Sequence, residues 1–176
     1  MIRLFLAAAA LTSTACGALD DFETTIEDEA TIPGTFNAQT PSPLNFGGSF
    51  SSLDLSANRE FSNQGVGPDD VDAIFVKAVH VESTEPMRDR LDVLLESIDL
   101  AVSSPGIAEK SVASKSQFPA APAVDLDVVP DLNLKPYATA ESMTMGATIS
   151  LKQKPTFTTT LRVTVTLAID INLLGT

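Results

Sequence analysis

The sequence predicts an all-β protein: a two-layer antiparallel β-sandwich of about seven or eight strands, immunoglobulin-like in general architecture, with short connecting helical turns. Two observations carry this prediction. Apolar and polar residues alternate over long stretches, which is typical of strands with one buried face. No stretch keeps the apolar period of a helix for more than a turn or two. A small closed barrel is the alternative architecture.

The clearest strand lies between residues 157 and 173. Every odd position from Leu161 to Leu173 is apolar, Phe157 extends this inward row, and the even positions are mostly polar. A second alternating stretch covers residues 142–152, with Met143 and Met145 facing inward. Because only the short, proline-containing sequence QKPT separates the two, we expect them to form an antiparallel hairpin.

Weaker versions of the pattern complete the predicted sandwich. Residues 73–82 begin with apolar side chains on both faces, as in an interior strand. Three short segments with a proline near their start, at Pro68, Pro86 and Pro136, are expected to be helical turns between strands. The remaining strand candidates are residues 24–32, 50–55, 94–102, 111–115 and 124–128.

Composition limits the classes of function. The 176 residues have room for one domain with its own core. Eleven Lys and Arg against 23 Asp and Glu give a net charge of -12, which argues against binding to nucleic acid or through a polybasic membrane surface. The sequence contains one histidine and no tryptophan.

The residues that could carry catalysis have simpler interpretations. His80 is the only imidazole, lies on a predicted strand, and has no Ser or Cys spaced as a nucleophile, so we expect a structural or exposed role. Asp125 and Asp127 lie two positions apart and face outward between Val124, Leu126 and Val128. A carboxylate pair can act in glycosidases, but this alternation indicates the solvated face of a strand. We therefore predict no catalytic residues and no enzymatic activity.

Metal and cofactor sites are not predicted either. Asp69, Asp70 and Asp72 form the densest carboxylate group and could bind Ca²⁺, but their spacing is not that of an EF-hand loop. Their position after Pro68 is explained by the preference for acidic residues at a helix start. The sequence FGGSF, with Gly47 and Gly48, lacks the lysine of a phosphate-binding loop.

The N-terminal segment has the features of an export signal. Arg3 precedes an apolar run from Leu4 to Leu11, which is far shorter than the roughly 20 residues of a transmembrane helix. Small residues up to Ala15 then precede Cys16, the only cysteine. This arrangement resembles a bacterial lipoprotein signal, although Ser13 stands where that family usually has leucine. The alternative is an ordinary secretory signal cleaved near Ala15.

The resemblance implies a signal peptide at residues 1–15 and lipidation of Cys16. Two or more acyl chains on Cys16 would anchor the protein stably in a membrane. Gly17 follows the cysteine, whereas Asp at that position favours inner-membrane retention in proteobacterial lipoproteins, so the implied location is the outer membrane. We expect an acidic tether at residues 16–22 and the β-sandwich domain at residues 23–176.

These expectations point to a membrane-anchored cell-envelope lipoprotein whose domain is non-enzymatic and has a binding or structural role. Its partners are then the membrane, through Cys16, and an envelope protein or polymer. The alternative is a secreted or surface-anchored adhesive or carbohydrate-binding module, which could depend on calcium. Such modules usually expose aromatic residues, and with no tryptophan and Tyr137 as the only tyrosine the sequence favours the first function.

Overall fold

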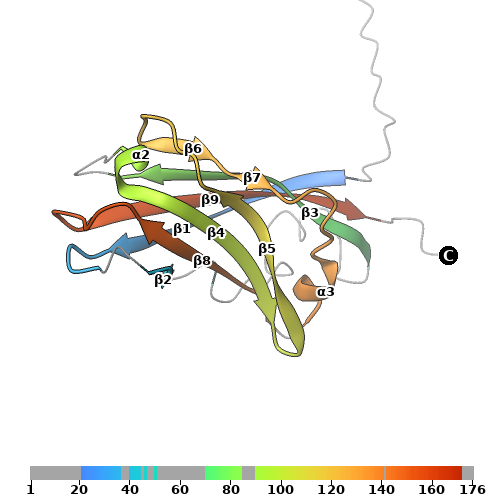
Figure 1. Ribbon diagram of the computed structural model, residues 1–176. Coiled ribbons are helices and arrows are strands. Elements are labelled where there is room, and N and C mark those ends of the chain that lie inside the picture. Colours follow the sequence, from blue (N-terminus) through green and yellow to red (C-terminus); the bar gives the residue numbers. More distant parts are fainter. Residues whose placement is uncertain are drawn as a thin grey trace, which may run out of the picture.

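The computed structural model describes residues 21–36, 40–44, 46, 50, 70–84, 90–140 and 142–171. Within these ranges the chain forms nine strands and two short helices (Figure 1). The elements are β1 (Asp21–Ile32), β2 (Ser42–Leu44), β3 (Val71–Ser83), α2 (Leu91–Leu94), β4 (Leu95–Ser104), β5 (Ile107–Lys115), β6 (Ala123–Asp125), β7 (Asp127–Val128), α3 (Lys135–Ala138), β8 (Thr144–Leu151) and β9 (Thr159–Ile171).

The strands form two antiparallel sheets. The four-stranded sheet has the order β1-β9-β3-β6, and the five-stranded sheet has the order β2-β8-β4-β5-β7. The two sheets pack as separate layers, so the predicted sandwich is confirmed and the closed barrel is not formed. Of the consecutive strands, only β4 and β5 pair as a hairpin. The other connections cross between sheets, except the one from β7 to β8, which joins two non-neighbouring strands of the five-stranded sheet. This is the strand order of a jelly roll rather than of an immunoglobulin domain.

β9 lies at the centre of the four-stranded sheet. It pairs with β1 from Asp21–Asp170 to Ile32–Thr159, and with β3 from Val71–Ile171 to Ser83–Leu161. This register defines two ends of the sandwich. The proximal end holds the start of β1, the start of β3 and the end of β9. The distal end holds the opposite ends of these strands and α2, on the left in Figure 1.

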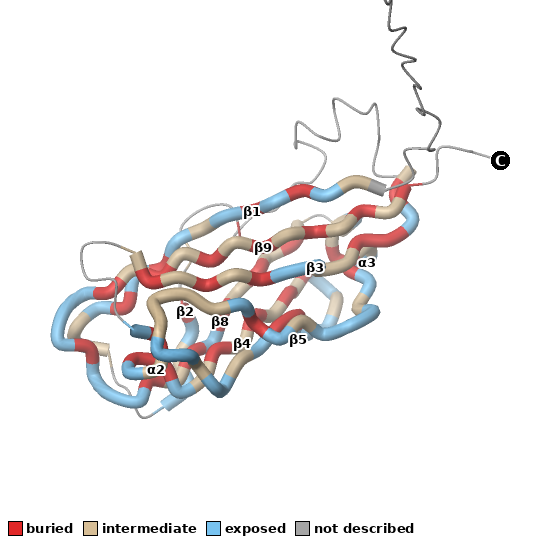
Figure 2. The backbone as a smooth tube through the Cα atoms, turned by 90° about the horizontal axis from the view of Figure 1, so that it is seen from above, coloured by how far each residue is buried: buried red, intermediate tan, exposed pale blue. Residues whose placement is uncertain are grey.

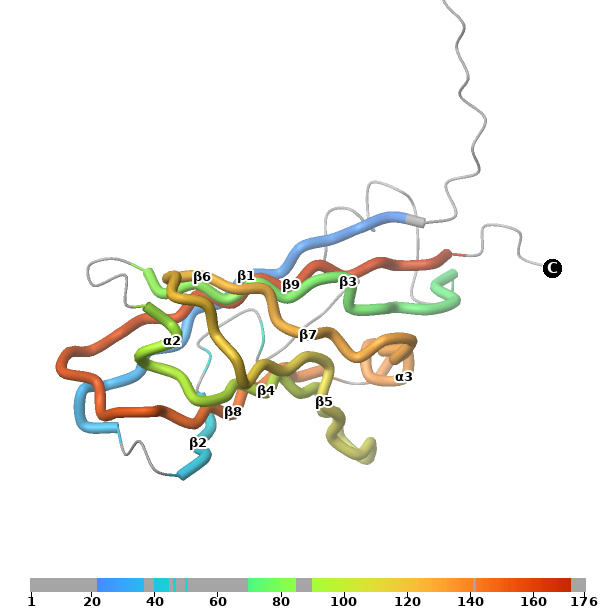
Figure 3. Tube along the Cα trace, turned by 45° about the horizontal axis from the view of Figure 1, so that its top comes forward, coloured from blue at the N-terminus to red at the C-terminus, as the bar shows by residue number. Residues whose placement is uncertain are grey.

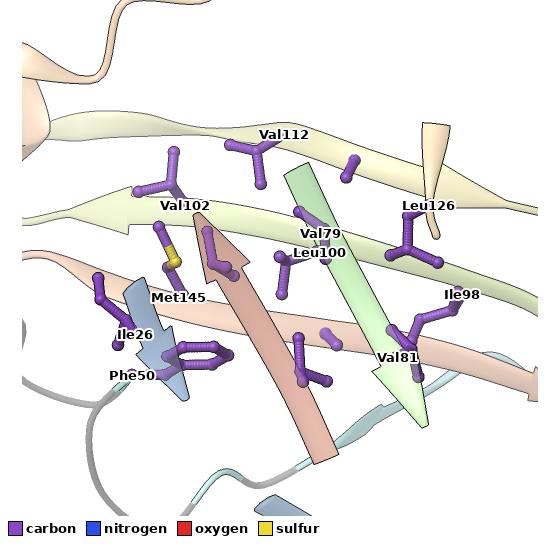
Figure 4. Packing of buried hydrophobic residues seen from close by; sticks show 14 of the residues in the cluster. Ile26, Phe50, Val79, Val81, Ile98, Leu100, Val102, Val112, Leu126 and Met145 are labelled. Carbon is purple, nitrogen blue, oxygen red and sulfur yellow. The ribbon is translucent and has the colours of Figure 1, made fainter. Parts of the chain in front are cut away.

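The hydrophobic core fills the space between the sheets. β9 contributes its odd-numbered row, and its residues from Leu161 to Ile171 alternate between buried and half-buried, as Figure 2 shows along the strand. β4 and β8 face this row with Ile98, Leu100 and Met145, and Phe50 closes the β1 side (Figure 4). The burial of these side chains confirms the inward faces predicted for β8 and β9. Each fully buried Leu or Val stabilises the folded state by about 1.5–3 kcal/mol.

The hairpin expected between residues 142–152 and 157–173 is wrong. β8 pairs with β2 and β4, whereas β9 pairs with β1 and β3, so the two strands lie in different sheets. Residues 152–158 span the gap, and Pro155 is buried within them. Phe157, predicted to face inward, is 57% exposed, because β9 begins only at Thr159 and the alternation does not extend into the connection.

The single strand expected at residues 124–128 is divided between the two sheets. β6 pairs with β3, and β7 pairs with β5, so the chain crosses from one layer to the other at Leu126 (Figure 3). Leu126 is 5% exposed, whereas Val124 and Val128 are only partly buried. The apolar triplet therefore supplies one core side chain at the crossing and two at its margins.

Two of the three predicted helical turns lie fully or partly within the described residues as α2 and α3, near the predicted starts at Pro86 and Pro136, although Pro86 itself lies outside the described residues. The third turn was expected around Pro68 to Ala73. Asp70 is 3₁₀-helical, Pro68 and Asp69 lie outside the described residues, and the turn cannot extend to Ala73 because β3 begins at Val71. Residues 50–55 lie outside the described ranges except for Phe50, which is fully buried.

β1 begins at Asp21, inside the stretch expected as tether, and Phe22 already packs against the core. All buried hydrophobic residues of the core lie between Ile26 and Ile171. A chain of residues 17–176 therefore keeps the whole described core and is used in the experiments below.

Truncation of the β9 core row should destabilise the sandwich. Val165→Ala or Leu167→Ala removes side chains with no exposed surface and should cost about 2–4 kcal/mol through lost burial and the cavity left behind. Thr164→Ala, on the opposite face, should cost much less. Urea titrations of the three variants measure the difference, and equal losses would contradict the register.

Candidate functional site

The outer face of the four-stranded sheet carries a dense group of charged side chains. β9 directs its even-numbered residues, mainly threonines, to this face. Glu23, Glu27 and Glu29 of β1 flank them on one side, and His80 and Glu82 of β3 flank them on the other. The face is therefore acidic and flat, except at the position where β9 has a small residue.

A hollow of about 420 Å³ opens at that position, near the proximal end. Ala168 of β9 lies in register between Glu23 of β1 and Phe75 of β3. Because alanine has the smallest side chain in this row, a gap remains between its two larger neighbours. Phe22, Lys77, Ile169 and Asp170 complete the lining.

A β-bulge shapes one wall of the hollow. The pairing of β3 with β9 shifts between Val76 and Ala78, which leaves Lys77 without a partner residue in the register. The Lys77 ammonium forms an ion pair with Glu23 across β9. The hollow thus combines an apolar floor, Phe75 and Ala168, with a charged rim in which carboxylates outnumber the lysine.

Arg162 is the centre of an ion-pair network nearer the distal end. Its guanidinium lies 2.8 Å from Glu29 Oε1, 3.2 Å from Glu27 Oε1 and 3.0 Å from Glu82 Oε1. The hydrogen bond to Glu29, together with the neighbouring carboxylate charges, raises the pKa of Arg162 above its ordinary value. One cation therefore joins β1, β9 and β3 on their exposed face.

His80 and the two aspartates that follow the crossing do not form a shared site. His80 Nδ1 lies 2.7 Å from Asp125 Oδ1, and both side chains are exposed. Asp127 instead lies 2.8 Å from the Lys115 ammonium, on the other sheet. The exposed role expected for His80 fits this placement, and the aspartates, expected on one strand face, are separated because their strand is divided.

The remaining candidate residues lie at the start of β3, in the core or outside the described residues. Asp70 and Asp72 flank the start of β3, while Asp69, Cys16, Gly47 and Gly48 lie outside the described residues. Among the side chains that the structure describes, no three His, Cys, Asp or Glu residues gather as metal ligands. Tyr137 is 3% exposed and its hydroxyl donates to the Ala108 carbonyl at 2.8 Å, so it offers no surface for a sugar ring.

Sequence reasoning missed the hollow and the Arg162 network. Each depends on which residues face each other across three strands, and β1 and β3 are far from β9 in the sequence. A weak signal for the hollow was present, since Ala168 interrupts the run of threonines and charged residues on the even positions of β9.

Comparison with known proteins identifies no family. No protein-family model and no curated protein matches the chain. Weakly similar solved structures include one of turnip yellow mosaic virus, with a TM-score of 0.27 and 12% identity, covering 99% of this chain and 93% of that chain. A structure of desmodium yellow mottle tymovirus has a TM-score of 0.26 and 9% identity, covering 100% and 98%. These values are too low to support an inference about function.

Removal of the Arg162 charge should destabilise the sheet in a salt-dependent manner. Arg162→Gln leaves Glu27, Glu29 and Glu82 without their common cation, so the urea midpoint should fall at low ionic strength. In about 1 M salt, where the Debye length is about 3 Å, the difference from the unmodified chain in the same salt should shrink. Lys154→Gln, which removes an exposed charge elsewhere, is the matched control, and a loss that salt does not reduce would contradict this role.

Calcium should not stabilise the domain. A ligand that binds only the folded state at a hundred times its Kd adds about 2.7 kcal/mol, which a thermal melt detects easily. We expect melts of residues 17–176 to coincide in millimolar Ca²⁺ and in chelator at matched ionic strength. A rise in Tm with Ca²⁺ that disappears in Asp69→Asn would instead identify a calcium site at Asp69, Asp70 and Asp72.

Proposed function

We propose that the protein is a lipid-anchored, non-enzymatic domain of the bacterial cell envelope, held at the outer membrane through Cys16, with a binding or structural role. The observation that carries the proposal is the distance in sequence between the predicted anchor and the fold. Cys16 precedes the first residue of β1, Asp21, by only five positions. A lipid on Cys16 would therefore hold the sandwich itself, rather than a long tether, at the membrane.

The covalent geometry of the chain limits the distance between anchor and domain. Five residues span at most about 18 Å when fully extended. The proximal end of the sandwich would thus lie within that distance of the lipid. The distal end would be about 36 Å farther along β1, given its 12 residues and the rise of a strand.

The pairing of polar groups supports a binding or structural role over a catalytic one. On the outer face of the four-stranded sheet, Lys77, His80 and Arg162 each contact a carboxylate across the strands. These contacts hold the strands together and are made by exposed groups, whereas catalytic groups generally lie in a cleft. Within the described ranges, neither helix has the length or apolar character needed to cross a bilayer, and the proposed attachment is the lipid.

The proposal is tested at the cysteine. Cys16→Ser should move the protein from the membrane fraction to the soluble or unprocessed fraction, because the acylated thiol is lost. Ser13→Leu, which brings the signal closer to the lipoprotein pattern, is the control and should remain in membranes. Mass spectrometry that finds an unmodified Cys16 at the start of the mature wild-type chain would overturn the proposal.

The membrane address is tested separately at the next residue. Gly17→Asp introduces the residue that favours inner-membrane retention in the lipoproteins this signal resembles. We expect the variant to move from outer-membrane to inner-membrane fractions on a density gradient while it stays lipidated. An unchanged distribution would contradict the outer-membrane assignment without affecting the anchor.

A further inference from the structure

The hollow and the connection between β8 and β9 lie at opposite ends of the sandwich and differ in local charge. The lining of the hollow has two carboxylates, Glu23 and Asp170, and one cation, Lys77. The distal loop, residues 152–158, has Lys152 and Lys154 and no acidic residue. The Lys152 ammonium donates to the Asp92 carbonyl, and its charge also acts on the Asp92 carboxylate. The distal loop itself is therefore cationic, although the Arg162 network with its three glutamates lies nearer the same end.

This distal loop also exposes apolar side chains. Phe157 is 57% exposed, and Val93 of the neighbouring α2 is 44% exposed. The two segments are adjacent because the Lys152 amide donates to the Leu94 carbonyl at 3.0 Å and the Lys152 ammonium donates to the Asp92 carbonyl at 3.0 Å. The described residues include only one other large hydrophobic side chain of comparable exposure, Val129.

Local packing holds Phe157 in this exposed position. Pro155 is buried two residues earlier, and the loop after β1 lies against its backbone. A side-chain carbon at Gly34 would be only 3.5 Å from the Phe157 carbonyl carbon and 3.6 Å from the Pro155 oxygen. Phe157 is thus presented by a supported loop, which lowers the entropic cost of placing it in a binding partner.

The hollow at the opposite end has the complementary chemistry. Its floor of Phe75 and Ala168 is apolar, and Glu23 and Asp170 place carboxylates on its rim. Its volume of about 420 Å³ is in the range of small ligand pockets and is large enough to hold one aromatic ring. An aromatic side chain preceded closely by two lysines matches such a site in both polarity and charge.

We propose that the distal loop of one copy docks into the hollow of a second copy, with Phe157 over Phe75 and Ala168, and with Lys152 and Lys154 beside the carboxylates of the rim. The contact joins two different surfaces, so it is heterologous and leaves a loop and a hollow open at the ends of each pair. Such contacts produce rows of molecules rather than closed dimers unless the geometry closes a ring.

The net charge does not prevent this contact. At physiological ionic strength the Debye length is about 8 Å, whereas the two ends of the sandwich are about 36 Å apart, so charges away from the contact are largely screened. The contact involves one short loop and one hollow, and contacts well below the roughly 1,200 Å² of stable complexes are weak, so the association in solution should be weak. At a membrane, where the proposed anchor would raise the local concentration, the same contact would form rows along the surface.

Sedimentation of the lipid-free chain, residues 17–176, tests the contact independently of lipidation. We expect concentration-dependent association between about 10 µM and about 1 mM, the range for a contact of this size. Phe157→Ala, which removes the aromatic ring, and Ala168→Leu, which fills the hollow, should each weaken association at least about tenfold. Both positions face solvent, so circular dichroism and melts should show unchanged folding.

The controls are matched changes at exposed positions away from both surfaces. Val129→Ala removes an exposed apolar side chain, and Ala108→Leu enlarges an exposed alanine on the five-stranded sheet. Neither should alter association. If the controls weaken association as much as Phe157→Ala and Ala168→Leu do, the proposed surfaces are not the interface.

A mixing experiment decides whether the contact is heterologous. The Phe157→Ala chain keeps an intact hollow, and the Ala168→Leu chain keeps an intact loop, so an equimolar mixture should form a one-to-one pair that does not grow further. A mixture that remains monomeric while the unmodified chain associates would overturn the proposal. An unmodified chain that stays monomeric over the whole concentration range would overturn it as well, and would leave the lipid-anchor proposal untouched.

Discussion

The packing of one row of β9 side chains between the sheets is the interaction on which the rest of the structure depends. β9 is hydrogen-bonded on both sides, to β1 and to β3, along nearly its whole length. Leu161, Val163, Val165 and Leu167 have no exposed surface. This row packs against the opposite sheet, and the backbone hydrogen bonds of β9 fix the register of β1 and β3. The position of β9 therefore determines where its neighbours lie and which face of the sheet is exposed.

The outer face follows from the same alternation. Since the odd residues of β9 are buried, its even residues must line the exposed surface, and the two neighbouring strands contribute their own polar side chains in register. Arg162 meets three glutamates there, and Ala168 leaves the hollow between Glu23 and Phe75. The ion pairs of Arg162 and the hollow at Ala168 are thus consequences of strand register. The packing of the core therefore also sets the position of the hollow that is proposed to bind a second copy.

The sequence predicted the parts of the fold that depend on local alternation. β1, β3, β4, β8 and β9 were expected from their apolar patterns, and the inward rows predicted for β8 and β9 are those observed. Alternation specifies a buried face but not the sheet that a strand joins, so the hairpin of β8 and β9 was predicted wrongly. The same limit applies at Leu126, where one short alternating segment contributes to both sheets, and at Phe157, where the pattern continues past the end of the strand.

The candidate site was less accessible from the sequence. A structural or exposed role was expected for His80, whose side chain is exposed, but its partner Asp125 lies 45 residues away on another strand. Arg162 and its glutamates come from β1, β3 and β9, and the hollow also requires the bulge at Lys77. Such groupings arise from long-range register, for which a single sequence holds little information. Cys16 and Asp69 lie outside the described residues, so their roles still rest on the sequence alone.

Hydrogen exchange of the native chain, residues 17–176, is the most direct test of the central role of β9. Amides exchange through local or global opening, and the slowest ones report the most stable part of the fold. The amides of Leu161 to Leu167 should exchange most slowly, with protection that approaches the global free energy of unfolding, while those of β2 and β7 exchange much faster. Comparable rates in β9 and in these short edge strands would contradict the account.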